Sequence, residues 1–136
     1  MLNVFTDGAY SSARNQGGIG VVVVKDGKVI QSFNKGYKNT TNNKMELTAV
    51  ISVLYAINKP LDKLVINTDS MYVIGCATRG WQRKKNQSLW QLYDRVFEQA
   101  SSYCSDIVFN HVKGHDTNEY NNLADKLAVE ASHLEL

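Results

Sequence analysis

The chain has 136 residues, 43% hydrophobic and 21% charged, which is typical of a soluble globular protein with one domain over residues 1–136 and a substantial core. The formal net charge is only +2, so any nucleic-acid partner would have to meet a local basic surface rather than a basic molecule. No apolar run reaches the length that a membrane span requires.

A short strand opens the chain and ends in Val4-Phe5-Thr6-Asp7-Gly8. Strand alternation directs Asp7 to the same side as the apolar Phe5, where an ionised carboxylate is costly to bury alone. Gly8 then marks a turn, a bulge or a close approach of another group to the backbone. The segment is either a strand that ends at an Asp-Gly turn or a strand that holds a carboxylate for a metal ion.

Two further strands complete an antiparallel meander. A polar loop is expected over residues 9–16, and Gly17-Gly18-Ile19-Gly20 then gives a tight entry into a buried strand at Val21–Val24. No Gly-Lys-Ser/Thr follows these glycines, so they do not read as a phosphate-binding loop. Asp26-Gly27 is typical of a hairpin turn, and the third strand is expected from about Lys28 to Tyr37.

A helix is expected from about Asn43 to Asn58, where it ends before Pro60. The small polar residues at 39–43 can cap its first turn. Glu46 lies in that turn, on the helix face that also carries Val50. A first-turn Glu is common because it complements the helix dipole, but a Glu on the buried face is less usual.

The second half of the chain alternates strands and helices, which predicts parallel strands. A strand over Leu61–Thr68 ends, like the first, in Thr-Asp, at Asp69. The elements expected after it are a helix over Ser70–Thr78, a helix from Gln87 to Tyr103, a strand over Asp106–Val112 and a final helix that starts near Glu119 and carries Asp125.

The segment between the first two of these helices is basic and contains an indole. It holds Arg79, Trp81, Arg83, Lys84 and Lys85. A run of charges is usually a solvated face. Aromatic rings beside basic residues also suit a sugar–phosphate backbone, so the segment is a second candidate surface.

The two cysteines, Cys76 and Cys104, lie far apart and outside any C-x-x-C pattern. This spacing argues against a disulfide framework and against a zinc site, and it favours buried thiols in a reducing compartment. Met1 leads straight into the first strand without a signal peptide. We therefore expect a cytoplasmic protein, and nothing in the pattern requires more than a monomer.

Four carboxylates stand at the ends of strands or on helices near loops: Asp7, Glu46, Asp69 and Asp125. If the first and fourth strands are neighbours, Asp7 and Asp69 converge. Carboxylates that lie close together cannot all stay ionised without a cation. Because the ligands are hard oxygens, they favour Mg²⁺ or Mn²⁺, and two such ions can activate water at a phosphodiester.

At this point the sequence resembles a known family, type 1 ribonuclease H, over essentially its whole length. The motifs that carry the resemblance are Phe5-Thr6-Asp7-Gly8, Thr40-Thr41-Asn42-Asn43-Lys44-Met45-Glu46-Leu47, Thr68-Asp69-Ser70, Val112-Lys113-Gly114-His115 and Asn122-Leu123-Ala124-Asp125. The resemblance implies an α/β fold with a mixed five-stranded sheet flanked by helices. It also implies an endonuclease that cuts the RNA strand of RNA–DNA hybrids and leaves 5′-phosphate and 3′-hydroxyl ends.

The resemblance also implies roles for the acidic residues. Asp7 would bridge two Mg²⁺ ions, for which Mn²⁺ can substitute. Glu46 and Asp69 would hold one ion and Asp125 the other, and His115 would assist proton transfer or product release.

Contacts to the hybrid are implied for a larger set of residues. Asn42 and Asn43 can both donate and accept hydrogen bonds, as recognition of an RNA 2′-hydroxyl requires. Thr41 matches the family's phosphate contact on the DNA strand. The full expected set is Gly8, Asn15, Thr41, Asn42, Asn43, Met71, Arg79, Trp81, Arg83, Lys84 and Lys85.

The sequence departs from the family pattern at three places. The basic segment is shorter than in the best-known bacterial members, which bears on affinity more than on chemistry. Met71 stands where a Gln often contacts the minor groove, and Ala13 stands where an Asn is usual, with Asn15 as its substitute. Substrate preference is therefore the property most open to change.

Two alternatives share the fold. One is a non-catalytic domain that binds hybrids, although unused clustered carboxylates would carry a repulsive cost. The other is a DNA strand-transfer or junction-resolving enzyme, against which Asn42, Asn43 and the Lys-Gly-His loop argue.

Overall fold

The computed structural model describes residues 1–113 and 118–136. A five-stranded sheet in the order β3-β2-β1-β4-β5 forms its centre. The strands are β1 (Leu2–Ser11), β2 (Gln16–Lys25), β3 (Lys28–Lys38), β4 (Leu61–Thr68) and β5 (Cys104–His111). The helices are α1 (Asn42–Ala56), α2 (Met71–Thr78), α3 (Gln87–Ser101) and α4 (Glu119–Ser132).

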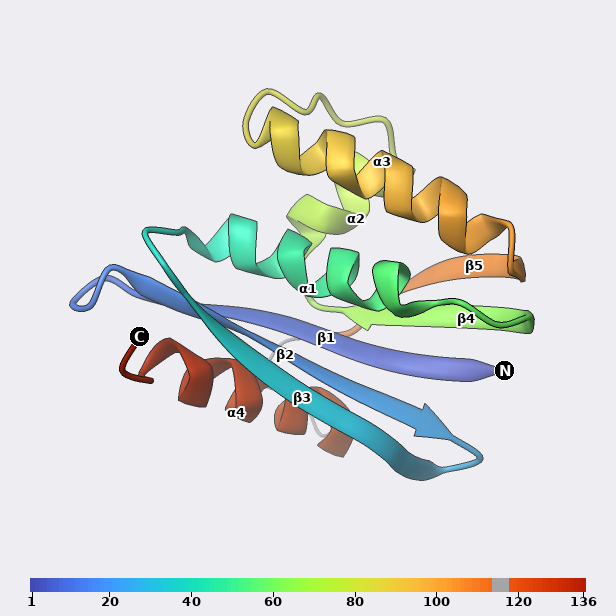
Figure 1. Ribbon diagram of the computed structural model, residues 1–136, viewed down its shortest axis with the longest axis horizontal. Helices are drawn as coiled ribbons and strands as arrows, with labels where there is room; N and C mark the ends of the chain where they lie inside the picture. The colour runs from blue at the N-terminus through green and yellow to red at the C-terminus, as the bar shows by residue number, and fades with distance from the viewer. Residues whose placement is uncertain (114–117) are drawn as a thin grey trace.

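The expected mixed sheet is confirmed. β1, β2 and β3 pair antiparallel, whereas β4 pairs parallel with both β1 and β5. Figure 1 shows α1, α2 and α3 above one face of the sheet and α4, in red, below the other. The parallel register of β1 and β4 pairs Phe5 with Asn67, so Asp7, within β1, and Asp69, just after β4, lie at the same level of the sheet.

The first two strands are longer than expected, and the predicted loop over residues 9–16 is wrong. Pairing between β1 and β2 continues to Ser11 and Gln16, so the turn is confined to residues 12–15. Asn15 closes it in the left-handed conformation, with φ 46°. Gly17, Gly18 and Gly20 therefore lie within β2 rather than before it, because the ladder satisfies their backbone groups.

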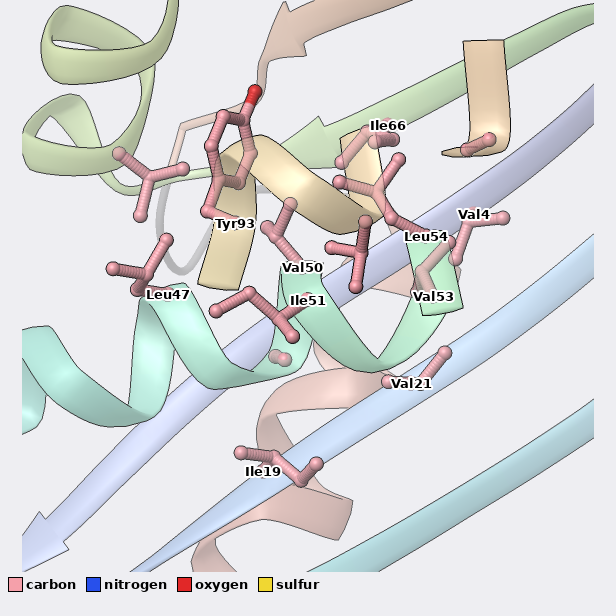
Figure 2. Packing of buried hydrophobic residues seen from close by; sticks show 14 of the residues in the cluster. Val4, Ile19, Val21, Leu47, Val50, Ile51, Val53, Leu54, Ile66 and Tyr93 are labelled. Atoms are coloured by element: carbon pink, nitrogen blue, oxygen red, sulfur yellow. The ribbon is translucent and has the colours of Figure 1, made fainter. Parts of the chain in front are cut away.

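The main core lies between the sheet and helices α1 and α3. Figure 2 shows Leu47, Val50 and Leu54 of α1 packed over Val4 of β1 and Ile66 of β4, all of them buried. Burying side chains of this size stabilises the fold by roughly 1.5–3 kcal/mol each. This packing holds α1, and with it Glu46, in a fixed position on the sheet.

A smaller core on the other face confirms the alternation expected of β1. Phe5 points to this side and packs against Val22 and Ala124. Its ring lies 5.4 Å from the ring of Tyr120, whose hydroxyl donates a 2.9 Å hydrogen bond to the carbonyl of Gly27. These contacts attach the start of α4 to the sheet and to the β2–β3 turn.

Both cysteines are buried and free, as expected, and burial raises the pKa of each thiol. Within the described ranges, no helix combines the length and the apolar character needed to cross a membrane.

Candidate metal centre and nucleic-acid surface

Three of the four predicted acids meet at one edge of the sheet. Asp7 of β1, Glu46 of α1 and Asp69 after β4 each offer a carboxylate oxygen, and these oxygens all lie within 4.8 Å of one another. Asp7 and Glu46 are buried and Asp69 is half-buried. Residues far apart in the chain are therefore brought into one acidic cluster.

Glu46 reaches the cluster because α1 starts very close to β1. Thr41 caps the helix by accepting a 3.2 Å hydrogen bond from the backbone of Lys44. Gly8 donates its backbone N–H to both the Glu46 and the Asp7 carboxylates. A Cβ on Gly8 would lie 2.6 Å from the Met45 carbonyl carbon, so the expectation of a close approach at this glycine is confirmed.

Asp69 is placed by a short capped turn between β4 and α2. The Thr68 hydroxyl accepts a 3.1 Å hydrogen bond from the backbone of Ser70, and the Ser70 hydroxyl accepts one of 3.2 Å from Val73. Such bonds satisfy the free N–H groups at a helix start. They fix the direction in which the chain leaves β4 and therefore the position of Asp69.

Asp125 approaches the cluster from the opposite face of the sheet. It is half-buried on α4, and the charge of its carboxylate contributes to the raised pKa of Asp7. Asn118 caps this helix by accepting 3.0 Å hydrogen bonds from Tyr120 and Asn121. Asp7 is thus the carboxylate that faces acids on both sides.

The acids perturb one another strongly. Burial raises the pKa of Asp7 to about 7; a hydrogen bond from Glu46 lowers it in part, while Asp69 and Asp125 add to the rise. Burial, followed by the charges of Asp7 and Asp69, raises the pKa of Glu46 well above its ordinary value. Groups of this kind are stable as carboxylates only beside a cation.

The donor set fits a hard divalent cation. It consists of carboxylate oxygens, which Mg²⁺, Mn²⁺ and Ca²⁺ prefer, and no thiol or imidazole among the described residues joins it. Two of its carboxylates are buried, so a bound ion would be partly shielded from solvent. His115, the remaining predicted catalytic residue, lies outside the described residues, as does Gly114.

The asparagines predicted to contact the hybrid stand beside this centre. Asn42 and Asn43 occupy the first turn of α1 and are exposed, one turn before Glu46. Asn15 is engaged within the protein: its side chain accepts a 3.0 Å hydrogen bond from Tyr10 and donates one of 3.0 Å to Asn39. Its contacts tie the β1–β2 turn to the chain just before α1.

The basic segment is only partly free to meet a partner. Arg79, Lys84 and Lys85 are exposed, whereas the Arg83 guanidinium donates 2.8 and 2.9 Å hydrogen bonds to Asp94 and lies 4.3 Å from the Trp90 ring. These contacts favour a structural role for Arg83.

The indole of Trp81 packs against α2 at Gly75. A Cβ on Gly75 would lie 2.6 Å from its Cε2 atom, and 48% of Trp81 remains exposed. Part of the ring is therefore held by the helix, and part of the residue faces solvent. Met71 is half-buried at the first position of the same helix.

Sequence reasoning missed a groove that runs along α1 and α3, from Lys44 to Tyr55 and from Asn86 to Val96. It has a volume of about 930 Å³, and its lining includes Lys38, Asn39, Lys44, Asn86 and Gln87. The elements that form it are distant in sequence, so no local pattern marks it. The only signal was Asn86 before an amphipathic helix, and this residue adopts the left-handed conformation.

A second missed residue is Asn121, one helical turn before Asp125. It is 2% exposed, and its Oδ1 atom has no hydrogen-bond partner within residues 1–113 and 118–136. A polar pattern in the first turn of a helix usually indicates solvent exposure, so sequence alone does not reveal this burial.

The chain is similar to known proteins along its whole length. The family model for RNase H matches residues 1–133. A Ribonuclease H of Thermoanaerobacter sp. strain X514 is 38% identical over 141 residues, covering 96% of this chain and 88% of that protein. RNase H1 of Halobacterium salinarum NRC-1 is 25% identical, with a TM-score of 0.77 over 96% of each chain. The structure of LC11-RNase H1 in complex with RNA/DNA hybrid has a TM-score of 0.78 over 97% and 96%, and at 22% identity this is a likeness of fold.

Proposed function

This chain belongs to the RNase H family, and we propose that it is an endoribonuclease that hydrolyses the RNA strand of RNA–DNA hybrids, leaving 5′-phosphate and 3′-hydroxyl ends. The observation that carries the proposal is the set of three carboxylates whose oxygens lie within 4.8 Å of one another. The family membership of the chain gives that set its chemistry, because relatives with 38% identity are named Ribonuclease H.

The acids divide between two metal positions. Asp7 faces acids on both sides, so we assign it to bridge two Mg²⁺ ions, with Mn²⁺ as a substitute. Glu46 and Asp69 would hold one ion and Asp125 the other. Bound in this way, such ions activate a water and stabilise the leaving oxygen of a phosphodiester.

The residues at the start of α1 would read the RNA strand. Asn42 and Asn43 are exposed one turn before Glu46, and their amides can both donate to and accept from a 2′-hydroxyl. Thr41, which caps α1, and the backbone of Gly8 would contact the sugar–phosphate chain. His115, which lies outside the described residues, would assist proton transfer or product release.

The exposed basic residues would hold the hybrid farther from the reacting bond. Arg79, Lys84 and Lys85 would contact phosphates, and the exposed part of Trp81 would lie against a sugar or base. Met71 would face the minor groove in place of a Gln. We assign Arg83 to holding this segment in shape, through Asp94.

Replacing both Lys84 and Lys85 with Gln should weaken hybrid binding. It should also make the negative slope of log K against log salt concentration shallower, by about 2. Each phosphate contact contributes about one to that slope. The measurement is a salt series of fluorescence anisotropy titrations in chelator. A matched variant that replaces Lys28 and Lys59, both exposed, should keep the wild-type slope. An unchanged slope in the Lys84/Lys85 variant would mean that both side chains only face solvent.

The proposal as a whole is tested with hybrids labelled on either strand. We expect cleavage of the RNA strand alone, dependent on Mg²⁺ and stopped by chelator, with little cleavage of DNA duplexes. Binding of the hybrid without turnover at any Mg²⁺ or Mn²⁺ concentration would instead support a non-catalytic binding domain. Equal cleavage of DNA duplexes would support a strand-transfer or junction-resolving enzyme.

A further inference from the structure

Helix α4, which carries Asp125, packs on β2, and at two glycines of the strand the helix backbone itself lies against the strand. Gly20 of β2 is the closest point: a Cβ there would lie 2.8 Å from the Ala128 nitrogen and closer still to the Ala124 carbonyl oxygen. Gly18 makes a similar approach, with a built Cβ 2.7 Å from the nitrogen of Ser132. Real Cβ contacts are not this short, so any side chain at either position would force the helix outward.

The closest point of this contact coincides with the acidic centre. Gly20 is the direct pairing partner of Asp7 in the β1–β2 ladder. Ala124, whose carbonyl oxygen faces Gly20, immediately precedes Asp125 in the chain. The contact that limits how closely α4 packs on the sheet is therefore next to both Asp7 and Asp125.

The contact cannot be relieved by a change of rotamer. The atoms that a Gly20 side chain would meet belong to the α4 backbone, and Ala124 and Ala128 are fully buried. The α4 and β2 backbones would have to move apart by about 1 Å to restore an ordinary separation. Displacements of that size at catalytic groups can cost on the order of a hundredfold in rate.

We propose that Gly20 is a positioning residue: the absence of a side chain at this position sets the spacing between Asp125 and Asp7. This inference rests on the proposed function, in which those two acids serve one metal position. Gly20 itself would contact neither the substrate nor a metal ion.

The test is a double-mutant cycle that combines Gly20→Ala with Asp125→Glu. Gly20→Ala should slow hybrid cleavage at least about tenfold and raise the Mg²⁺ concentration needed for half-maximal rate. Asp125→Glu alone should also slow cleavage. The double variant should be faster than Gly20→Ala, because the extra methylene, about 1.5 Å, restores the reach of a displaced carboxylate. If the rate of the double variant is reduced by the product of the two single-variant reductions, the proposal is overturned.

Gly18→Ala is the matched control, because it introduces the same kind of clash one helical turn farther from Asp125. It should cost similar stability in urea unfolding while keeping the wild-type Mg²⁺ dependence. If it changes that dependence as much as Gly20→Ala does, the effect is general loosening of α4 and the proposal fails. Should Gly20→Ala unfold, the comparison is made in trimethylamine N-oxide, which favours the folded state.

A crystal structure of the Gly20→Ala variant separates this inference from the proposed function. The distance between the Cα atoms of Asp7 and Asp125 should increase by about 1 Å relative to the unsubstituted protein. That result is independent of cleavage, so it stands even if the chain does not cut hybrids. An unchanged distance would overturn the positioning role however active the enzyme is.

Discussion

Asp7→Asn should lower the rate of hybrid cleavage by at least about a thousandfold while leaving the fold intact. Asp7 is the acid that faces Glu46, Asp69 and Asp125, so its charge serves both proposed metal positions. Removing a ligand shared by two ions removes several kcal/mol of transition-state stabilisation, and each 1.36 kcal/mol is a factor of ten. The measurement is single-turnover cleavage of a strand-labelled hybrid at saturating Mg²⁺.

The same substitution should make the metal-free protein more stable at pH 8, by about 1–3 kcal/mol. Asp7 is 5% exposed among other acids, and Asn keeps its shape without its charge. Asp106→Asn is the matched control, because Asp106 is exposed on β5 and should change neither property. A destabilised Asp7→Asn protein would mean that lost activity reflects misfolding, and retained cleavage would contradict the assignment of Asp7.

The acidic centre could be predicted from sequence because its geometry follows from strand direction. Asp7 and Asp69 each follow an apolar run, and the parallel register that pairs Phe5 with Asn67 brings the two acids to the same level of the sheet, although β1 itself continues to Ser11. Glu46 was recognisable as an acid on an apolar helix face. What the pattern left open was how closely α1 approaches Gly8, because helix-to-sheet distance depends on atoms that are remote in the chain.

The proposed nucleic-acid surface was less predictable, since a basic residue looks the same in sequence whether or not it has an internal partner. Arg83 lies in a run of cations, yet its guanidinium is bound to Asp94 and stacked on Trp90, contacts that span a loop and a helix. Asn15 is similarly engaged with Tyr10 and Asn39. Such pairings arise from tertiary structure, and local composition carries no trace of them.

The glycines of β2 illustrate the same limit in a different way. Before the structure, Gly18 and Gly20 indicated only a tight entry into a strand. In the structure they lie within the β1–β2 ladder, where the absence of a side chain lets α4 pack directly against the strand. Spacing along the chain cannot reveal this contact. The proposed role of Gly20 depends on two tertiary neighbours, its ladder partner Asp7 and the helix α4.

The metal-free protein should lose stability as pH rises from about 4 to 7. The pKa of Asp7 is raised from 3.8 in the unfolded chain to about 7 in the fold, and that of Glu46 is also raised. Over this window the folded state binds more protons than the unfolded state, so the free energy of unfolding falls with pH. For Asp7 the fall is on the order of 3–5 kcal/mol, and it levels off above pH 7.

Urea unfolding in chelator at several pH values measures this slope, and Asp7→Asn should flatten part of it. The lowered pKa of the exposed Asp62 acts only below about pH 4, outside the window. Saturating Mg²⁺ should remove the slope, because a cation stabilises the ionised carboxylates that the metal-free fold disfavours. Stability that stays constant or rises between pH 4.5 and 7 in chelator would contradict the raised pKa values. If instead Mg²⁺ leaves the slope unchanged, the acids do not form a metal centre, and the proposed chemistry fails with them.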